Sequence, residues 1–73
     1  MGFYQMTTGE RIKEARLNKG LSQNQLVERL NNNGSKITRT SISLWENGHR
    51  DIRLDKAIEL CKALEISLDE LME

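Results

Sequence analysis

Three short patterns in this chain of 73 residues each predict the first turn of an α-helix. Each pattern is a Ser or Thr followed three residues later by Glu or Gln, as in a capping box. There the hydroxyl accepts a hydrogen bond from a first-turn N–H, and the longer side chain accepts one from the backbone of the capping residue. Repeated helix starts in a chain without proline favour a fold of short helices. The pairs are Thr7 with Glu10, Ser22 with Gln25, and Ser67 with Glu70.

Apolar pairs at the hydrophobic staple positions support the same interpretation: Leu21 with Leu26, Ile37 with Ile42, and Ile66 with Leu71. We expect Thr38 to cap a central helix over 39–47, which Gly48 ends in the left-handed conformation. The other helices are expected from about 9 to 18, from 22 to a polar turn at 31–37, from about 53 to 64, and from 67 onward. The sequence therefore predicts an all-α fold, a compact bundle of five short helices over residues 8–73, after a flexible N-terminal tail at 1–7.

The spacing of apolar residues predicts which side of each helix is buried. In the first helix Ile12 and Ala15 mark that side, with Arg16 beside them. The second helix has an apolar stripe of Leu26, Val27 and Leu30. In the fourth helix the predicted buried residues are Leu54, Ala57, Ile58, Cys61 and Leu64.

The central helix has two sides of different chemistry. Ile42 and Trp45 are three residues apart, so both are expected to point into the core. The opposite side differs from an ordinary solvated face, which would carry Glu and Lys, and this favours a contact surface over an ordinary core helix. That side carries Thr40, Ser43, Leu44 and Asn47, with Arg39 at its flank.

The net charge of zero conceals an uneven distribution along the chain. Residues 1–50 contain eight Lys or Arg and four Asp or Glu, whereas residues 51–73 contain three and seven. The first segment is therefore basic and the second acidic. A dipole of this kind can turn its basic end toward phosphate, so the sequence permits a nucleic-acid partner that is bound less tightly as salt rises.

Composition argues against several other classes of protein. The single His49 and single Cys61 are too few for a zinc site or a Cys-His nucleophile. We therefore expect no metal, no cofactor and no enzyme activity. No apolar run approaches the ~18 residues that span a membrane. A lone cysteine fits a reducing compartment, so we expect a cytoplasmic protein.

Three longer motifs follow one another along the chain: G-L-S-Q-x-x-L-x-x-x-L at 20–30, R-T-S-I-S-L-W-E-N-G at 39–48, and L-x-x-A-x-x-L-C-x-A-L-x-I-S-L-D-E-L at 54–71. Together they resemble the phage repressor and Cro type (XRE-like) helix-turn-helix family over about residues 8–72. The resemblance implies a lambda repressor-like DNA-binding domain whose third helix enters the major groove. It also implies a sequence-specific regulator of double-stranded DNA, a repressor of phage, prophage or bacterial type.

The resemblance also assigns roles to individual residues. It implies that Arg16 pairs with Glu46, although two separate surface charges are the alternative. The residues expected at base edges are Arg39, Thr40, Ser43 and Leu44. The residues expected at phosphates are Ser22, Gln23, Lys36, Thr38, Asn47, Gly48, His49, Arg50 and Arg53.

A single short helix contacts few base pairs, so we expect a homodimer on a two-fold symmetric operator. Its interface is expected at Leu68, Leu71 and Met72, covered by Phe3 and Tyr4. The alternative is a protein-interaction module of the same fold, antitoxin-like or scaffold, with a protein partner at the fourth and fifth helices.

The chain departs from the family pattern in three places. The turn at 31–37 is longer than usual. Arg53 stands where a capping Ser or Thr is common. Glu65 replaces a glycine, and this costs about 1 kcal/mol if it is left-handed.

Overall fold

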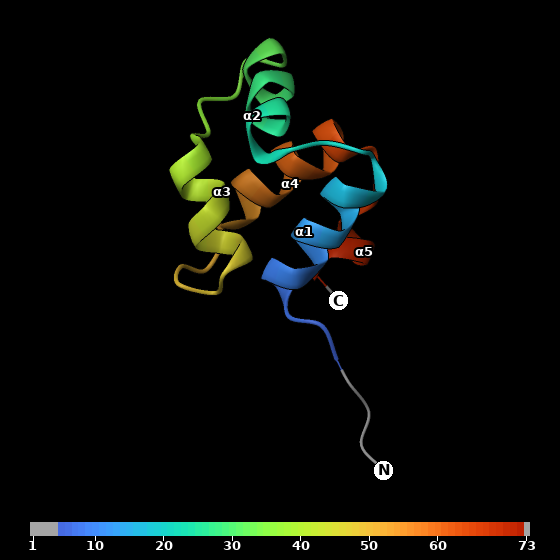
Figure 1. The fold of residues 1–73 in the computed structure, drawn as a ribbon. Coiled ribbons are helices and arrows are strands. Elements are labelled where there is room, and N and C mark those ends of the chain that lie inside the picture. Colours follow the sequence, from blue (N-terminus) through green and yellow to red (C-terminus); the bar gives the residue numbers. More distant parts are fainter. Residues whose placement is uncertain (1–4, 73) are drawn as a thin grey trace.

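The computed structural model describes residues 5–72, which form five helices and no strand. The helices are α1 (Thr8–Asn18), α2 (Gln23–Asn32), α3 (Arg39–Glu46), α4 (Leu54–Leu64) and α5 (Leu68–Met72) (Figure 1). The predicted all-α bundle of five short helices is confirmed. Residues 1–4 lie outside the described residues, and with them the predicted cover of Phe3 and Tyr4 and most of the predicted flexible tail.

The helix starts follow the side-chain chemistry of the sequence. Thr7 and Glu10 form both hydrogen bonds of a capping box at α1, and Ser22 with Gln25 does so at α2. Ser67 and Glu70 exchange the same two bonds before α5. By contrast Arg53 precedes α4 without any side-chain cap, as expected from its position.

Glycines decide where α2 and α3 end. The predicted turn at 31–37 begins too early, because α2 continues through Asn32. Gly34 then takes a left-handed φ of 87°, and the N–H of Ser35 donates to the carbonyl of Leu30. The central helix ends one residue earlier than predicted, at Glu46, because Asn47 caps it before the left-handed Gly48. Both ends therefore close where a glycine permits the left-handed conformation.

Glu65 confirms the expected departure at the end of α4. It is the only residue among 5–72, apart from glycines, with a positive φ, at 59°. Its carboxylate forms an exposed ion pair with Lys19, and this hydrogen bond and charge lower the pKa of Glu65. The small stabilisation from this pair is present above the carboxylate's unfolded pKa and is lost as pH falls through the lowered value.

One apolar core joins all five helices, but the predicted stripe of α4 was partly wrong. Leu54 and Ile58 are 58% and 40% exposed. Leu60 and Ala63 are buried instead, beside Ala57, Cys61 and Leu64. The reason is that α4 is nearly surrounded by apolar residues in sequence, and its contacts with α2 and α5 select the side that becomes buried.

Gly9 allows α1 to approach the end of α3 closely. A Cβ atom at this position would overlap the carbonyl oxygen of Trp45 and lie 2.9 Å from that of Glu46. Both obstacles are backbone atoms, which cannot rotate away as a side chain can. The position of α3 against α1 therefore depends on a missing side chain.

We expect Gly9→Ala to lower the free energy of unfolding by about 3 kcal/mol, since the added methyl group forces two helices apart. Gly→Ala inside an exposed helix ordinarily stabilises by about 1 kcal/mol, so the predicted effect has the opposite sign. Urea denaturation followed by circular dichroism measures it. Glu14→Ala, at an exposed position of the same helix, serves as the control. A neutral or stabilising Gly9→Ala would contradict the close approach.

Candidate nucleic-acid interface

The four residues predicted to contact bases lie together on the outward side of α3. They line a shallow hollow of about 210 Å³, to which no other residue among 5–72 contributes. Ile42 and Trp45 are buried on the opposite side of the helix. The two-sided helix expected from sequence is thus present, with its polar side open to a partner. The hollow's residues are Arg39, Thr40, Ser43 and Leu44.

A buried ion pair holds the end of α3 to α1. Arg16 Nε donates to Glu46 Oε2 at 2.8 Å and Arg16 Nη2 donates to Glu46 Oε1 at 3.1 Å. Arg16 Nη1 donates to the carbonyl of Leu21 at 2.8 Å. The same guanidinium therefore also holds the turn between α1 and α2. Each residue of the pair is only 7% exposed. The expected pair is therefore confirmed, and the alternative of two separate surface charges is wrong.

Gln23, the first residue of α2, forms a hydrogen bond to this ion pair. Its Nε2 donates to Glu46 Oε1 at 3.1 Å, which uses one of the two N–H groups of the amide. The second N–H remains available to an anion. Asn47, directly after Glu46, is exposed, and its Nδ2 donates to Ser43 Oγ at 3.4 Å. We call Gln23 and Asn47 the amide edge, since both lie next to Glu46.

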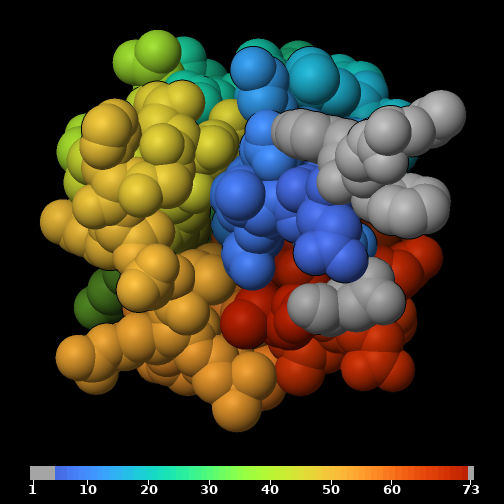
Figure 2. Space-filling view, turned by 90° about the horizontal axis from the view of Figure 1, so that it is seen from below, coloured from blue at the N-terminus to red at the C-terminus, as the bar shows by residue number. Residues whose placement is uncertain are grey.

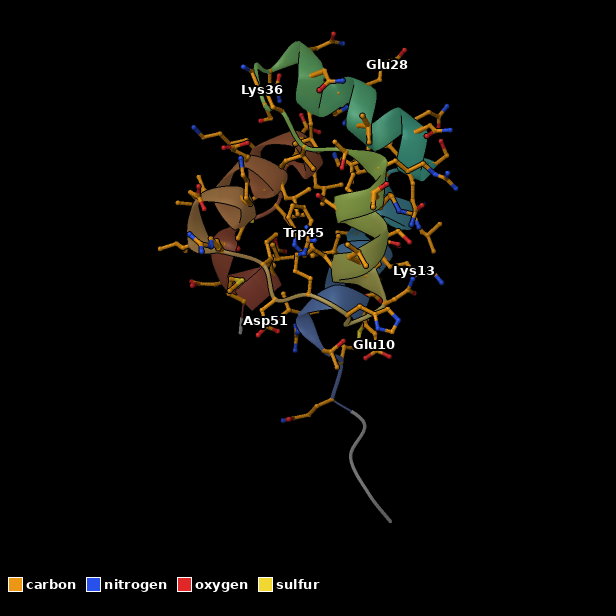
Figure 3. The ribbon with its side chains drawn as sticks, turned by 90° about the vertical axis from the view of Figure 1, so that its left-hand side faces the viewer. Glu10, Lys13, Glu28, Lys36, Trp45 and Asp51 are labelled. Atoms are coloured by element: carbon orange, nitrogen blue, oxygen red, sulfur yellow. The ribbon has the colours of Figure 1, made fainter. Side chains whose placement is uncertain are left out.

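Four cationic side chains gather in a groove on another side of α3. The groove, of about 450 Å³, has Ile37, Ser41 and Trp45 in its lining and one acidic residue, Asp51. Figure 3 shows Lys36 and Asp51 on either side of Trp45. Lys56 Nζ also lies 3.9 Å from Glu59 Oε2, which is not in the lining. The four cations still outnumber these two carboxylates, so the groove can hold an anion such as a DNA phosphate. This basic groove is defined by Lys36, Arg50, Arg53 and Lys56.

Sequence reasoning missed two cations near α3. Lys56 completes the basic groove three residues after Arg53, a helical spacing that could have revealed it. Lys13, exposed on α1, lines a hollow with Asn47 and Gly48 and lies beside α3 in Figure 3. No signal in the sequence identifies Lys13, since its place depends on how α1 packs against α3.

The remaining predicted residues are exposed at the ends of α2 and α3. Ser22 and Thr38 are exposed and cap α2 and α3, with Thr38 Oγ1 accepting from the N–H of Ser41 at 3.2 Å. His49 is exposed, and its backbone N–H donates to the carbonyl of Leu44 at 2.9 Å.

Within residues 5–72 no cluster of His, Cys, Asp or Glu could hold a metal ion. No helix in that part of the chain is long and apolar enough to cross a membrane.

The predicted dimer residues need one correction. Leu71 is fully buried in the core of its own subunit, because it occupies the staple position of α5. Its side chain is therefore not available to a second copy. Leu68 is half-buried, and Met72 is 38% exposed.

Comparison with known proteins gives a consistent result. A family model described as Helix-turn-helix matches residues 12–71. The crystal structure of the restriction-modification controller protein C.AhdI from Aeromonas hydrophila is similar to this chain, with 32% sequence identity and a TM-score of 0.77. The similarity covers 89% of this chain and 91% of that chain. Among curated proteins, none matches the chain.

We expect Glu46→Gln to lower the free energy of unfolding by about 3 kcal/mol, because the buried guanidinium of Arg16 loses the charge that balances it. Urea denaturation measures the loss. The double variant Arg16→Met, Glu46→Leu removes both charges and should cost less than the single change. A double variant that is less stable than Glu46→Gln would show that the pair does not act by charge balance.

Proposed function

We propose that this chain, which belongs to the XRE-type helix-turn-helix family and is a DNA-binding transcription regulator, represses transcription. It would do so by sequence-specific binding of α3 in the major groove. The observation that carries the proposal is the outward side of α3, where Arg39, Thr40, Ser43 and Leu44 lie together and none of them is needed in the core. A helix with such a side fits the major groove of B-DNA, which admits an α-helix.

Each side chain of the hollow has a matching group on base edges. The guanidinium of Arg39 can donate two hydrogen bonds to O6 and N7 of one guanine. Thr40 and Ser43 have hydroxyls that both donate and accept. Leu44 can pack against a thymine methyl group, which gives a reason for an apolar residue on an outward side. The four together favour a site that contains G·C and A·T pairs.

Phosphate contacts would lie on separate sides of α3. The amide edge of Gln23 and Asn47 offers neutral N–H donors with fixed direction, with Lys13 as a nearby cation. The basic groove offers charge. Because neutral donors release no counterions, we propose that the amide edge sets the register on the duplex and that the basic groove supplies most of the salt-dependent affinity.

We propose further that the protein acts as a homodimer on a two-fold symmetric operator. With only eight residues, α3 contacts few base pairs, and a second copy doubles the contact. Two such helices must then be about 34 Å apart, one turn of DNA. Similarity to a restriction-modification controller protein supports a regulatory role without fixing the genes controlled.

A protein-interaction module of the same fold is the alternative. An NMR titration of labelled protein with mixed-sequence duplex DNA at low salt separates the two. We expect shifts at the α3 hollow, the amide edge and the basic groove, reversed by added salt. Unmoved resonances there would contradict the DNA-binding proposal and favour a protein partner.

We expect Arg39→Ala to weaken binding to an operator selected from random DNA by about 10-fold to 100-fold, since one bidentate base contact is lost. Binding to unrelated DNA should weaken by less. Fluorescence anisotropy on both duplexes measures the ratio. An equal loss on both duplexes would show that Arg39 contacts phosphate instead.

We expect Arg53→Gln to weaken binding to both duplexes alike and to reduce the slope of log K against log salt by about 1. The control is Lys19→Gln, which removes the same charge at the exposed pair with Glu65. It should leave the slope unchanged. Equal slopes for the Arg53→Gln variant and the unaltered protein would exclude the basic groove from the interface.

A further inference from the structure

An exposed apolar strip lies on the side of α4 that the core does not use. Leu54 and Ile58 are one helical turn apart and are 58% and 40% exposed. The strip lies next to α5, because the Sγ atom of Cys61, one turn after Ile58, donates to the carbonyl of Ser67. Figure 2 shows the start of α4 (orange) adjoining α5 (red) on one face of the molecule.

Two opposite charges accompany this strip. Asp55 is in the first turn of α4 and Lys62 in its last turn, and both are exposed. They are seven residues apart, so they lie on the same side of the helix but about 10 Å apart along its axis. Within residues 5–72 the structure gives neither of them an ion-pair partner. We call Leu54, Asp55, Ile58 and Lys62 the α4 face.

This arrangement is complementary to itself. If two copies of α4 pack antiparallel about a two-fold axis beside Ile58, each first turn lies against the other copy's last turn. Asp55 of one copy then meets Lys62 of the other in two equivalent pairs, one on each side of the axis. The apolar residues fill the space between the two pairs, and the antiparallel helix dipoles also favour this orientation.

We propose that the α4 face is the homodimer interface, with a second copy of this chain as its occupant and two reciprocal Asp55–Lys62 ion pairs fixing its register. This inference rests on the homodimer in the proposed function and names its contacts. It replaces the buried Leu71 with residues that are exposed in the single subunit. Since the two pairs are related by symmetry, each single substitution alters both of them.

The test is sedimentation equilibrium of the protein without DNA, at low salt. We expect a dimer for the unaltered chain. Asp55→Lys and Lys62→Asp, each alone, place like charges opposite each other and should raise the dimer dissociation constant by about tenfold or more. The two single variants mixed in equal amounts should form a heterodimer. Both ion pairs are then restored, one of them with its positive and negative partners exchanged. Glu28→Lys, an equal charge change at an exposed position of α2, is the matched control and should leave the dimer intact.

The outcomes separate the two proposals. A monomeric unaltered chain would overturn the homodimer of the proposed function. A dimer that Asp55→Lys leaves unchanged would overturn the α4 face alone. A variant that merely unfolds would not recover on mixing, whereas recovery by the mixed variants requires the proposed pairing. Failure of two folded single variants, verified by circular dichroism, to associate on mixing would also overturn it.

Discussion

The carboxylate of Glu46 holds the parts of this interface in their relative positions. It accepts two hydrogen bonds from Arg16 of α1 and one from Gln23 of α2, although it belongs to the last turn of α3. Three donors on one buried carboxylate restrict the directions of the Arg16 guanidinium and the Gln23 amide. One acidic residue therefore sets the position of the Gln23 amide relative to α3. The close approach of Gly9 to the backbone carbonyls of Trp45 and Glu46 also holds α1 against the end of α3.

Local chemistry made much of the fold predictable from sequence. Capping boxes, staples and glycines act within a few residues, so the five helices and the outward side of α3 could be predicted. Residues whose place depends on packing could not. The exposure of Leu54 and Ile58 follows from which neighbours α4 contacts, and Lys13 lies near Asn47 only because α1 crosses the end of α3. The Arg16–Glu46 pair, 30 residues apart in the chain, was expected through family resemblance and not from spacing.

Charge is arranged in space differently from its order along the sequence. The acidic segment 51–73 contributes Arg53 and Lys56 to the basic groove, beside Lys36 and Arg50 from the basic segment. The acidic segment also brings Asp51 into the groove and Glu59 to within 3.9 Å of Lys56. The groove therefore has a local excess of positive charge, which can attract phosphate although the net charge of the whole chain is zero. A net charge of zero is therefore a poor guide to the partners of this protein.

The hollow on α3 has a consequence for how this protein can change. Its four side chains take almost no part in holding the bundle together, whereas Ile42, Trp45 and Glu46 in the same helix do. In the proposed binding mode, stability and sequence preference therefore reside in different residues of one helix. New target sequences can be acquired by substitution at Arg39, Thr40, Ser43 and Leu44 without repacking the interior. The domain is in this sense an interchangeable scaffold, on which binding specificity can diverge faster than the fold that presents it.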